Sequence, residues 1–258
     1  TGGAGALPGY LPARVNAVVV CELEGVSSGL PAPLRFRLET LGTLLETLTR
    51  RGVAEVCCAG AIRRPAIDPS RIDAATMPLV PQMMAALQAG DDGALRAAVA
   101  IFEGAGFKVR GAHQIAPELL PEAGCPTRAA PSDKNRTDAT RAEMIHTALA
   151  SADVGQACVV SAGQALAVEA LGGTDWMLAS LANGRRPPGP EGGVLYKAPK
   201  AGQDLRVDMP VIGPDTAEGA KQAGLDGIVV AHGGVMIPEP AETIAACDAA
   251  GLFLWVRE

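Results

Sequence analysis

Short apolar segments rich in β-branched residues alternate along the chain with segments of helical periodicity. VNAVVV at Val15–Val20 and VAEVCCA at Val53–Ala59 have the composition of buried strands. Between them, Thr40–Arg51 places its leucines on one helical face, with Thr40 in position to cap the helix. The same patterns predict a helix at Ile72–Leu87, either continuous or broken at Pro78 or Pro81, a helix at Gly93–Glu103 and a strand at Phe107–Val109. Such alternation indicates an α/β fold with a parallel sheet covered on both faces.

The second half of the chain also alternates, but it contains a hairpin. Two apolar runs flank Ala162–Gly163, which is typical of antiparallel strands joined by a tight turn. The remaining patterns predict helices at Ala139–Ala152, from Thr174, at Thr216–Ala223 and at Pro240–Ala250, and strands at Gly193–Lys197, Leu205–Pro210, Gly227–Ala231 and Leu252–Val256. We therefore predict a mixed α/β arrangement for this half.

The segment Leu119–Asp138 interrupts both patterns. It is rich in Pro, Ala and charged residues and has neither a helical nor a strand period, which is typical of a connection between domains. We therefore predict two α/β domains, residues 1–120 and 139–258, joined by residues 121–138.

Composition excludes several classes of protein. The net charge of −6 argues against nucleic-acid binding, which needs a basic surface. The longest uncharged apolar runs are shorter than the roughly 20 residues of a membrane span. The six cysteines have no zinc-type spacing and no CxxC pair, so we expect a reducing compartment and predict a cytoplasmic protein.

Two glycine-containing turns are candidate ligand loops. In GGAGALP, the glycines Gly2, Gly3 and Gly5 would let backbone N–H groups approach a phosphate; an ordinary turn is an equally good interpretation. GAIRRP follows the strand predicted at Val53–Ala59 and places Arg64 where open parallel sheets bind ligands. The alternative for GAIRRP is a solvated basic loop.

An aspartate interrupts the last part of the segment GQDLRVDMPVIG. Asp208 lies between Val207 and Met209 in a predicted strand, where a buried carboxylate must be paired, hydrogen-bonded or bound to a metal. Strand alternation would place Arg206 on the same side as Asp208. An Arg–Asp surface pair is one interpretation. The other is a hard-cation site, with Lys197 and Arg206 beside phosphate oxygens.

Other polar residues favour structural roles. The GDD at Gly90–Asp92 is typical of a helix N-cap. His113 and His232 follow predicted strands without a visible partner, and His146 is expected on the solvent edge of its helix.

Several segments together resemble a known family, the UDP-2,3-diacylglucosamine pyrophosphatases of the LpxI type, which are unrelated to the calcineurin-like phosphoesterases. In the second half these segments are Ala152–Val160, Ala165–Leu178, Gly192–Thr216, Ala223–Val230 and Ala250–Val256. In the first half they are GGAGALP, the region from Leu41 through GAIRRP, Gly90–Arg96 and Gly106–His113. The resemblance covers nearly the whole chain.

The resemblance implies an enzyme of lipid A biosynthesis in Gram-negative bacteria. Members hydrolyse UDP-2,3-diacylglucosamine to 2,3-diacylglucosamine 1-phosphate (lipid X) and UMP with Mg2+, by attack of water on the α-phosphorus. The implied fold has a Rossmann-like N-terminal domain with a parallel sheet and a C-terminal mixed α/β domain for catalysis and lipid binding, with the active site between them. A homodimer and peripheral contact with the inner membrane are further expectations.

The resemblance also implies site residues. The family's essential aspartate corresponds to Asp208, which we predict to bind Mg2+ together with Asp175. The predicted catalytic residues are Asp208, Asp175, Thr174 and Lys197. The predicted substrate-binding residues are Gly2, Gly3, Gly5, Leu7, Pro8, Arg64, Pro65, Gln203 and Arg206.

Two other functions are open to test. A protein that binds a nucleotide sugar or lipid phosphate without hydrolysing it is favoured by Gly173, where family members commonly have Glu. A nicotinamide-dependent oxidoreductase is disfavoured, because Pro8 stands where a dinucleotide fingerprint needs its third glycine.

Overall fold

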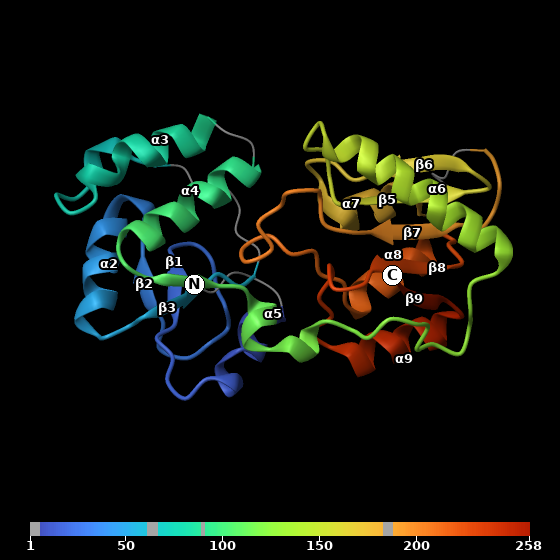
Figure 1. Cartoon of the computed structure of the whole chain (residues 1–258), viewed down its shortest axis with the longest axis horizontal. Coiled ribbons are helices and arrows are strands. Elements are labelled where there is room, and N and C mark those ends of the chain that lie inside the picture. The colour runs from blue at the N-terminus through green and yellow to red at the C-terminus, as the bar shows by residue number, and fades with distance from the viewer. Residues whose placement is uncertain (1–5, 61–66, 89–90, 183–187) are drawn as a thin grey trace. The chain divides into compact units, whose positions relative to one another are not determined.

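The chain divides into two compact units, each with its own core. The first comprises Thr1–Pro117 together with Asp204–Asp208, and the second comprises Glu118–Gln203 and Met209–Glu258. The computed structural model describes residues 6–60, 67–88, 91–182 and 188–258 (Figure 1).

The first unit contains two pairs of parallel strands. β1 (Cys21–Leu23) pairs with β2 (Leu34–Phe36), and β3 (Glu55–Cys57) pairs with β4 (Lys108–Arg110). The strand predicted at Val15–Val20 is wrong. Most of that run is exposed, and the pairing begins at Cys21, where the chain becomes buried. A β-branched run without a buried face has no partner surface to stabilise it as a strand.

The helices of the first unit enclose its apolar core. They are α1 (Leu7–Tyr10), α2 (Leu41–Arg50), α3 (Val80–Gln88), α4 (Asp91–Gly104) and α5 (Ala112–Ile115). The core combines the buried face of α2 with residues of β3, α4 and β4. Helix α2 approaches its neighbouring segment closely, because a Cβ at Gly42 would lie 2.2 Å from the carbonyl carbon of Ala75.

The structure decides two details of the predicted helices. The segment Ile72–Leu87 is broken at its prolines, as the second alternative had it, into a 3-10 turn at Met77–Leu79 followed by α3. Proline explains the break, since Pro78 and Pro81 are tolerated only in the first turn of a helix. Thr40 precedes α2 but makes no side-chain cap; its hydroxyl bonds to the backbone of Arg37 instead.

The second unit is built on a five-stranded mixed sheet in the order β6-β5-β7-β8-β9. β5 pairs antiparallel with both β6 and β7, whereas β7, β8 and β9 are parallel to one another. The strands are β5 (Ala157–Ser161), β6 (Gln164–Val168), β7 (Val194–Lys197), β8 (Gly227–Ala231) and β9 (Phe253–Arg257). The predicted hairpin at Ala162–Gly163 is confirmed.

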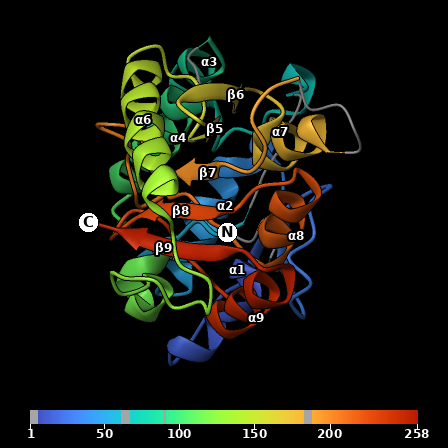
Figure 2. The ribbon, with the colours of Figure 1, turned by 90° about the vertical axis from the view of Figure 1, so that its right-hand side faces the viewer.

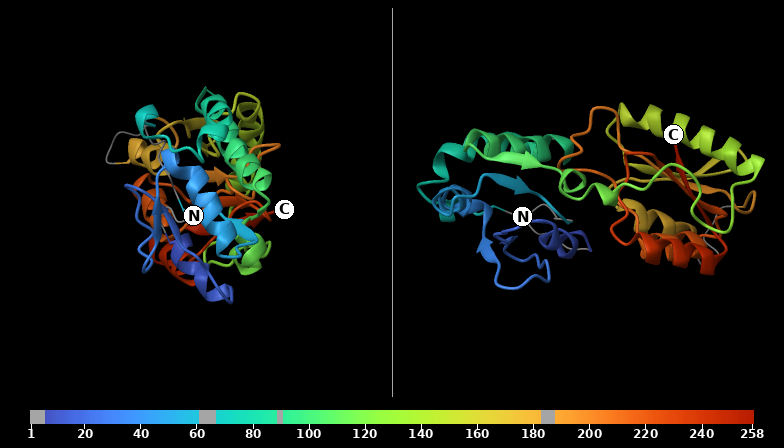
Figure 3. Two further views of the ribbon diagram at one scale, coloured as in Figure 1. Left: turned by 90° about the vertical axis from the view of Figure 1, so that its left-hand side faces the viewer. Right: turned by 60° about the horizontal axis from the view of Figure 1, so that its bottom comes forward.

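Helices cover both faces of this sheet. Helix α6 (Asp133–Ala150) packs on one face, and α7 (Gly173–Leu181), α8 (Pro214–Gln222) and α9 (Pro240–Ala250) lie on the other (Figure 2). The right panel of Figure 3 shows the same layering from another side. The solvent-edge position predicted for His146 is wrong, because this side chain is buried against Tyr196 of β7.

The segment before α6 makes specific contacts within the second unit. Gly124 and Val256 exchange two backbone hydrogen bonds, of 2.9 and 2.8 Å. Helix α6 begins earlier than its apolar pattern indicated, at Asp133, because Ser132 caps it by accepting from the Asn135 N–H at 3.2 Å. Among the described residues, no helix is long and apolar enough to cross a membrane.

Candidate functional site

The aspartate that directed the sequence analysis lies in a turn of the first unit. Leu205–Val207 form a turn, and the N–H groups of Val207 and Asp208 both donate to the Asp204 carbonyl, at 3.1 Å. The strand predicted at Leu205–Pro210 is therefore wrong, and so is the argument from strand alternation. Asp204 explains the turn, because its carboxylate also accepts from the Arg206 N–H at 3.1 Å.

Arg206 is paired with carboxylates other than Asp208. Its Nε and Nη2 donate to the two carboxylate oxygens of Asp204, at 2.9 and 2.7 Å, and its Nη1 donates to Glu103 Oε1 at 2.7 Å. These contacts raise the pKa of Arg206, and the Arg206 guanidinium lowers the pKa of Asp204. Through its contacts with Asp204, Arg206 shapes the loop that carries Asp208.

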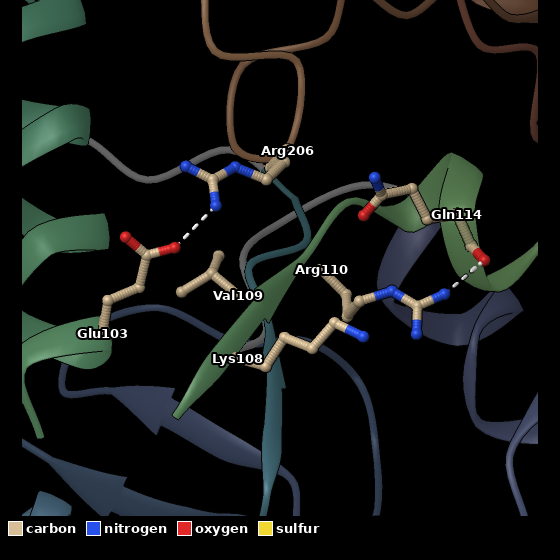
Figure 4. A pocket seen from close by; sticks show the side chains of 6 residues that line it. All are labelled: Glu103, Lys108, Val109, Arg110, Gln114 and Arg206. Atoms are coloured by element: carbon tan, nitrogen blue, oxygen red, sulfur yellow. Dashed lines mark hydrogen bonds and ion pairs between the residues drawn. The ribbon is translucent and has the colours of Figure 1, made fainter. Parts of the chain in front are cut away.

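An open pocket of about 530 Å³ lies beside this loop in the first unit (Figure 4). Its lining residues are Glu103, Lys108, Val109, Arg110, Gln114 and Arg206. The cations have carboxylate neighbours: Arg110 contacts both oxygens of Glu55 at 3.2 Å, and Lys108 lies 3.4 Å from the same carboxylate. An anionic ligand in this pocket would have to compete with these acids.

Gly111 allows the loop and the start of α5 to approach each other. A Cβ at this position would lie 2.5 Å from Cε1 of His113 and 3.1 Å from the Arg206 Cα. The His113 Nδ1 atom is buried without a hydrogen-bond partner in the described part of the chain, and burial lowers the pKa of this histidine. The structural role expected for His113 is consistent with this packing.

Several predicted ligand residues lie outside the described part of the chain. They are Gly2, Gly3, Gly5, Arg64 and Pro65. Leu7 and Pro8 begin α1, where both are buried, so their side chains contribute to packing. The side chains of Asp91 and Asp92 also lie outside the described set, although α4 does begin at Asp91.

The second unit brings Thr174 and Lys197 together. Lys197 ends β7 and is only 8% exposed, and its Nζ donates to Thr174 Oγ1 at 2.8 Å. Thr174 lies in the first turn of α7 and is itself buried. Its hydroxyl donates to Glu169 Oε2 at 3.0 Å. The three residues form a continuous hydrogen-bonded chain.

Glu169 is a candidate functional residue that the sequence analysis missed. It follows β6 directly, within an apolar segment whose pattern predicts a strand but gives no indication that the acid is functional. The available signal was its place shortly before the Thr174–Asp175 pair.

Asp175 also belongs to the first turn of α7, but its side chain is exposed. Gly173, the first residue of α7, has a φ of +78°, a conformation that residues other than glycine rarely adopt. The local backbone therefore gives a structural reason for glycine at position 173.

Gln203 and Lys200 stabilise the turn that follows β7. The Gln203 Oε1 atom accepts from the Lys200 N–H at 2.8 Å, and the Lys200 ammonium pairs with Asp153. Gln203, predicted to bind substrate, thus has a local structural contact.

Apolar side chains are exposed around the same first turn of α7. Leu171 is fully exposed and Trp176 is 66% exposed, and Val168 at the end of β6 is also exposed. Large apolar side chains gathered at a surface are typical of sites that contact an apolar ligand or partner.

The candidate metal ligands, Asp208 and Asp175, do not belong to a larger cluster of metal-binding side chains among the described residues. In that part of the chain no three His, Cys, Asp or Glu side chains form a group that could hold a metal ion. Mg2+ in phosphate sites is commonly held by one or two carboxylates together with substrate oxygens and water. Asp208 in the first unit and Asp175 in the second are each a single carboxylate, so their predicted role as Mg2+ ligands stays a prediction.

The structure is that of a two-domain α/β protein, and comparison of its sequence with known families identifies both domains. The family model of the LpxI N-terminal domain matches residues 2–119, and the family model of the LpxI C-terminal domain matches residues 122–255. UDP-2,3-diacylglucosamine pyrophosphatase LpxI of Caulobacter vibrioides is 36% identical over 219 residues, which cover 83% of this chain and 78% of the relative. The chain belongs to the LpxI family, and the resemblance seen in the sequence is confirmed.

Proposed function

We propose that the protein hydrolyses UDP-2,3-diacylglucosamine to lipid X and UMP, as an enzyme of lipid A biosynthesis. Family membership over both domains and the name of the Caulobacter relative support a pyrophosphatase. In the structure, the observation that supports it best is the buried Lys197 ammonium beside the first turn of α7. A positive group held near a helix N-terminus is suited to phosphate oxygens.

The proposed reaction places water in line with the α-phosphorus. Charge on the diphosphate must be neutralised, because it repels the incoming nucleophile and accumulates on the leaving group. Lys197 would donate to a phosphate oxygen, with Thr174 fixing the direction of its ammonium. Burial strengthens this interaction, since water screens charge poorly in an enclosed site.

The proposed cofactor is Mg2+, for which Asp208 and Asp175 are each a candidate ligand. When bound, the ion would supply Lewis-acid polarisation and lower the pKa of a coordinated water. The contribution of the chain is to present the carboxylates: Asp208 through the turn that Asp204 and Arg206 shape, and Asp175 through the first turn of α7.

The substrate class requires contact with acyl chains. The exposed Leu171 and Trp176 lie in the same segment as Thr174 and Asp175, so an apolar surface adjoins the polar groups. This arrangement suits an amphiphile that carries phosphate and hydrocarbon. The Rossmann-like first domain, the glycine-turn contact with the nucleotide, the homodimer and peripheral membrane contact stay predictions.

The test is direct assay with UDP-2,3-diacylglucosamine and Mg2+, following UMP. In 18O-water the label should enter UMP; label in the sugar phosphate would contradict attack at the α-phosphorus. Asp208→Ala should lower kcat by about 1000-fold, because a proposed ligand of the charge-neutralising Mg2+ is lost, while the fold is kept. Near-normal turnover in this folded variant would remove Asp208 from the mechanism.

The second candidate is a protein that binds the same ligand without hydrolysis. It is favoured by Gly173, which leaves the first residue of α7 without the acidic side chain that family members commonly have there. Tight binding of UDP-2,3-diacylglucosamine with no UMP formed at any Mg2+ concentration would support this candidate.

A further inference from the structure

Glu169 is held in place by the backbone around it. Its N–H donates to the Ala157 carbonyl of β5 at 2.9 Å. Gly155 has a φ of +59°, and a Cβ there would lie 2.1 Å from the Glu169 carbonyl oxygen. Only a residue without a side chain allows this close passage of the two backbones, so the position of Glu169 is fixed by the sheet rather than by a free loop.

The donor and acceptor inventory fixes the direction of each hydrogen bond. An ammonium has donors only, so Thr174 Oγ1 must accept from Lys197. A threonine hydroxyl carries one proton, and that proton points to Glu169. The carboxylate therefore orients the hydroxyl so that its lone pair faces Lys197.

We propose that Glu169 is a positioning residue for Lys197 and that it acts through the Thr174 hydroxyl. The inference rests on the proposed function, in which Lys197 donates to phosphate. Without an acceptor at position 169, the hydroxyl proton is free to rotate toward the ammonium, and Lys197 Nζ then loses Thr174 Oγ1 as an acceptor. The ammonium would then lose the direction that aims its remaining protons at the substrate.

The experiment measures kcat and KM for UMP release in a set of variants. Glu169→Ala and Thr174→Val should each lower kcat by about tenfold, because each removes one charge-assisted hydrogen bond, with KM changed less. Thr174→Ser keeps the hydroxyl and Glu169→Gln keeps an acceptor oxygen, so both should retain at least about a third of wild-type kcat. Glu218→Gln, an exposed acid of α8, is the matched control and should be unchanged.

The double variant Glu169→Ala with Thr174→Val distinguishes positioning from a separate role. If Glu169 acts only through the hydroxyl, the double variant should be no slower than Thr174→Val alone, because effects on one network are not additive. Losses that multiply, or a Glu169→Gln variant as slow as Glu169→Ala, would overturn the proposal.

Circular dichroism and thermal melts of each variant identify failure to fold. If Glu169→Ala does not fold, comparison of Glu169→Gln with Thr174→Val still decides the question. Wild-type protein that releases no UMP would refute the proposed function itself, an outcome separate from any ranking of the variants.

Discussion

Lys197 of the second unit and Arg206 of the first are both candidate phosphate-binding cations, but their surroundings differ. Lys197 is buried, and its ammonium donates to the Thr174 hydroxyl, which in turn donates to the Glu169 carboxylate. Arg206 has a side chain that is 33% exposed and contacts two carboxylates directly. Direct contact with two acids reduces the charge that Arg206 can offer a ligand. We therefore expect ligand binding at Lys197 and loop shaping at Arg206.

The largest expected effect tests the Lys197 side of this comparison. Lys197→Met keeps the length and the apolar stem of the side chain but removes its charge. We expect kcat to fall about 100- to 1000-fold, the usual effect of losing one preorganised donor to a charged transition state. UMP release by purified, folded protein is the measurement.

Lys200→Met is the matched control for Lys197. Lys200 lies near it in sequence, and its side chain, 12% exposed, pairs directly with the Asp153 carboxylate rather than with Thr174, so its loss should change kcat less than about threefold. Equal losses in the two lysine variants would show that the Thr174 contact does not mark the functional cation.

An intermediate effect tests the Arg206 side. If Arg206 shapes the loop with Asp204, then Asp204→Asn and Arg206→Ala disturb the same structure. Both should lower kcat about tenfold, since each removes a bidentate, charge-assisted contact and shifts Asp208. The measurement is kcat and KM for UMP release in both variants.

The two loop variants separate the alternatives. If Arg206 binds phosphate directly, Asp204→Asn should strengthen substrate binding by releasing the guanidinium, whereas Arg206→Ala should raise KM strongly. Glu103→Gln is the milder control, because one exposed ion pair contributes about 1 kcal/mol or less. A lower KM in Asp204→Asn together with a higher KM in Arg206→Ala would show that Arg206 binds the substrate directly.

The same two regions show what the sequence could predict. β8 and α9 were predicted with the bounds that the structure has, and the hairpin at Ala162–Gly163 was identified, because buried runs and turn glycines there are local signals. The pairing of Thr174 with Lys197 could not be derived, since it depends on where β7 ends relative to α7 in space.

The strand predicted around Asp208 was wrong for a different physical reason. Val207 and Met209 flank Asp208 as in an alternating strand, but the Asp204 carboxylate and carbonyl capture the following N–H groups and close a turn. Side chains that compete for backbone hydrogen bonds override a short apolar pattern. The sequence predicted Asp208 as the partner of Arg206. The structure pairs Arg206 with Asp204, which lies in the same turn, and with Glu103, which is remote in sequence.

The smallest expected effect is on stability and concerns a carboxylate of the first unit. Glu39 is 2% exposed, and its pKa is lowered from 4.5 to about 2, first by the Asp68 N–H and then by the Arg37 side chain. Because the folded state holds Glu39 ionised, its contribution is complete above about pH 4.5 and is lost as the pH falls toward 2. Glu39→Gln should therefore lower the free energy of unfolding at pH 7 by at most about 3 kcal/mol, and the difference from wild type should shrink to near zero at pH 2. Urea unfolding across this range is the measurement.

Glu24→Gln is the control, because Glu24 binds the same arginine at the surface and should change stability by less than about 1 kcal/mol. A Glu39→Gln deficit that stays constant from pH 7 to pH 2 would show that the residue acts by packing rather than by its charge.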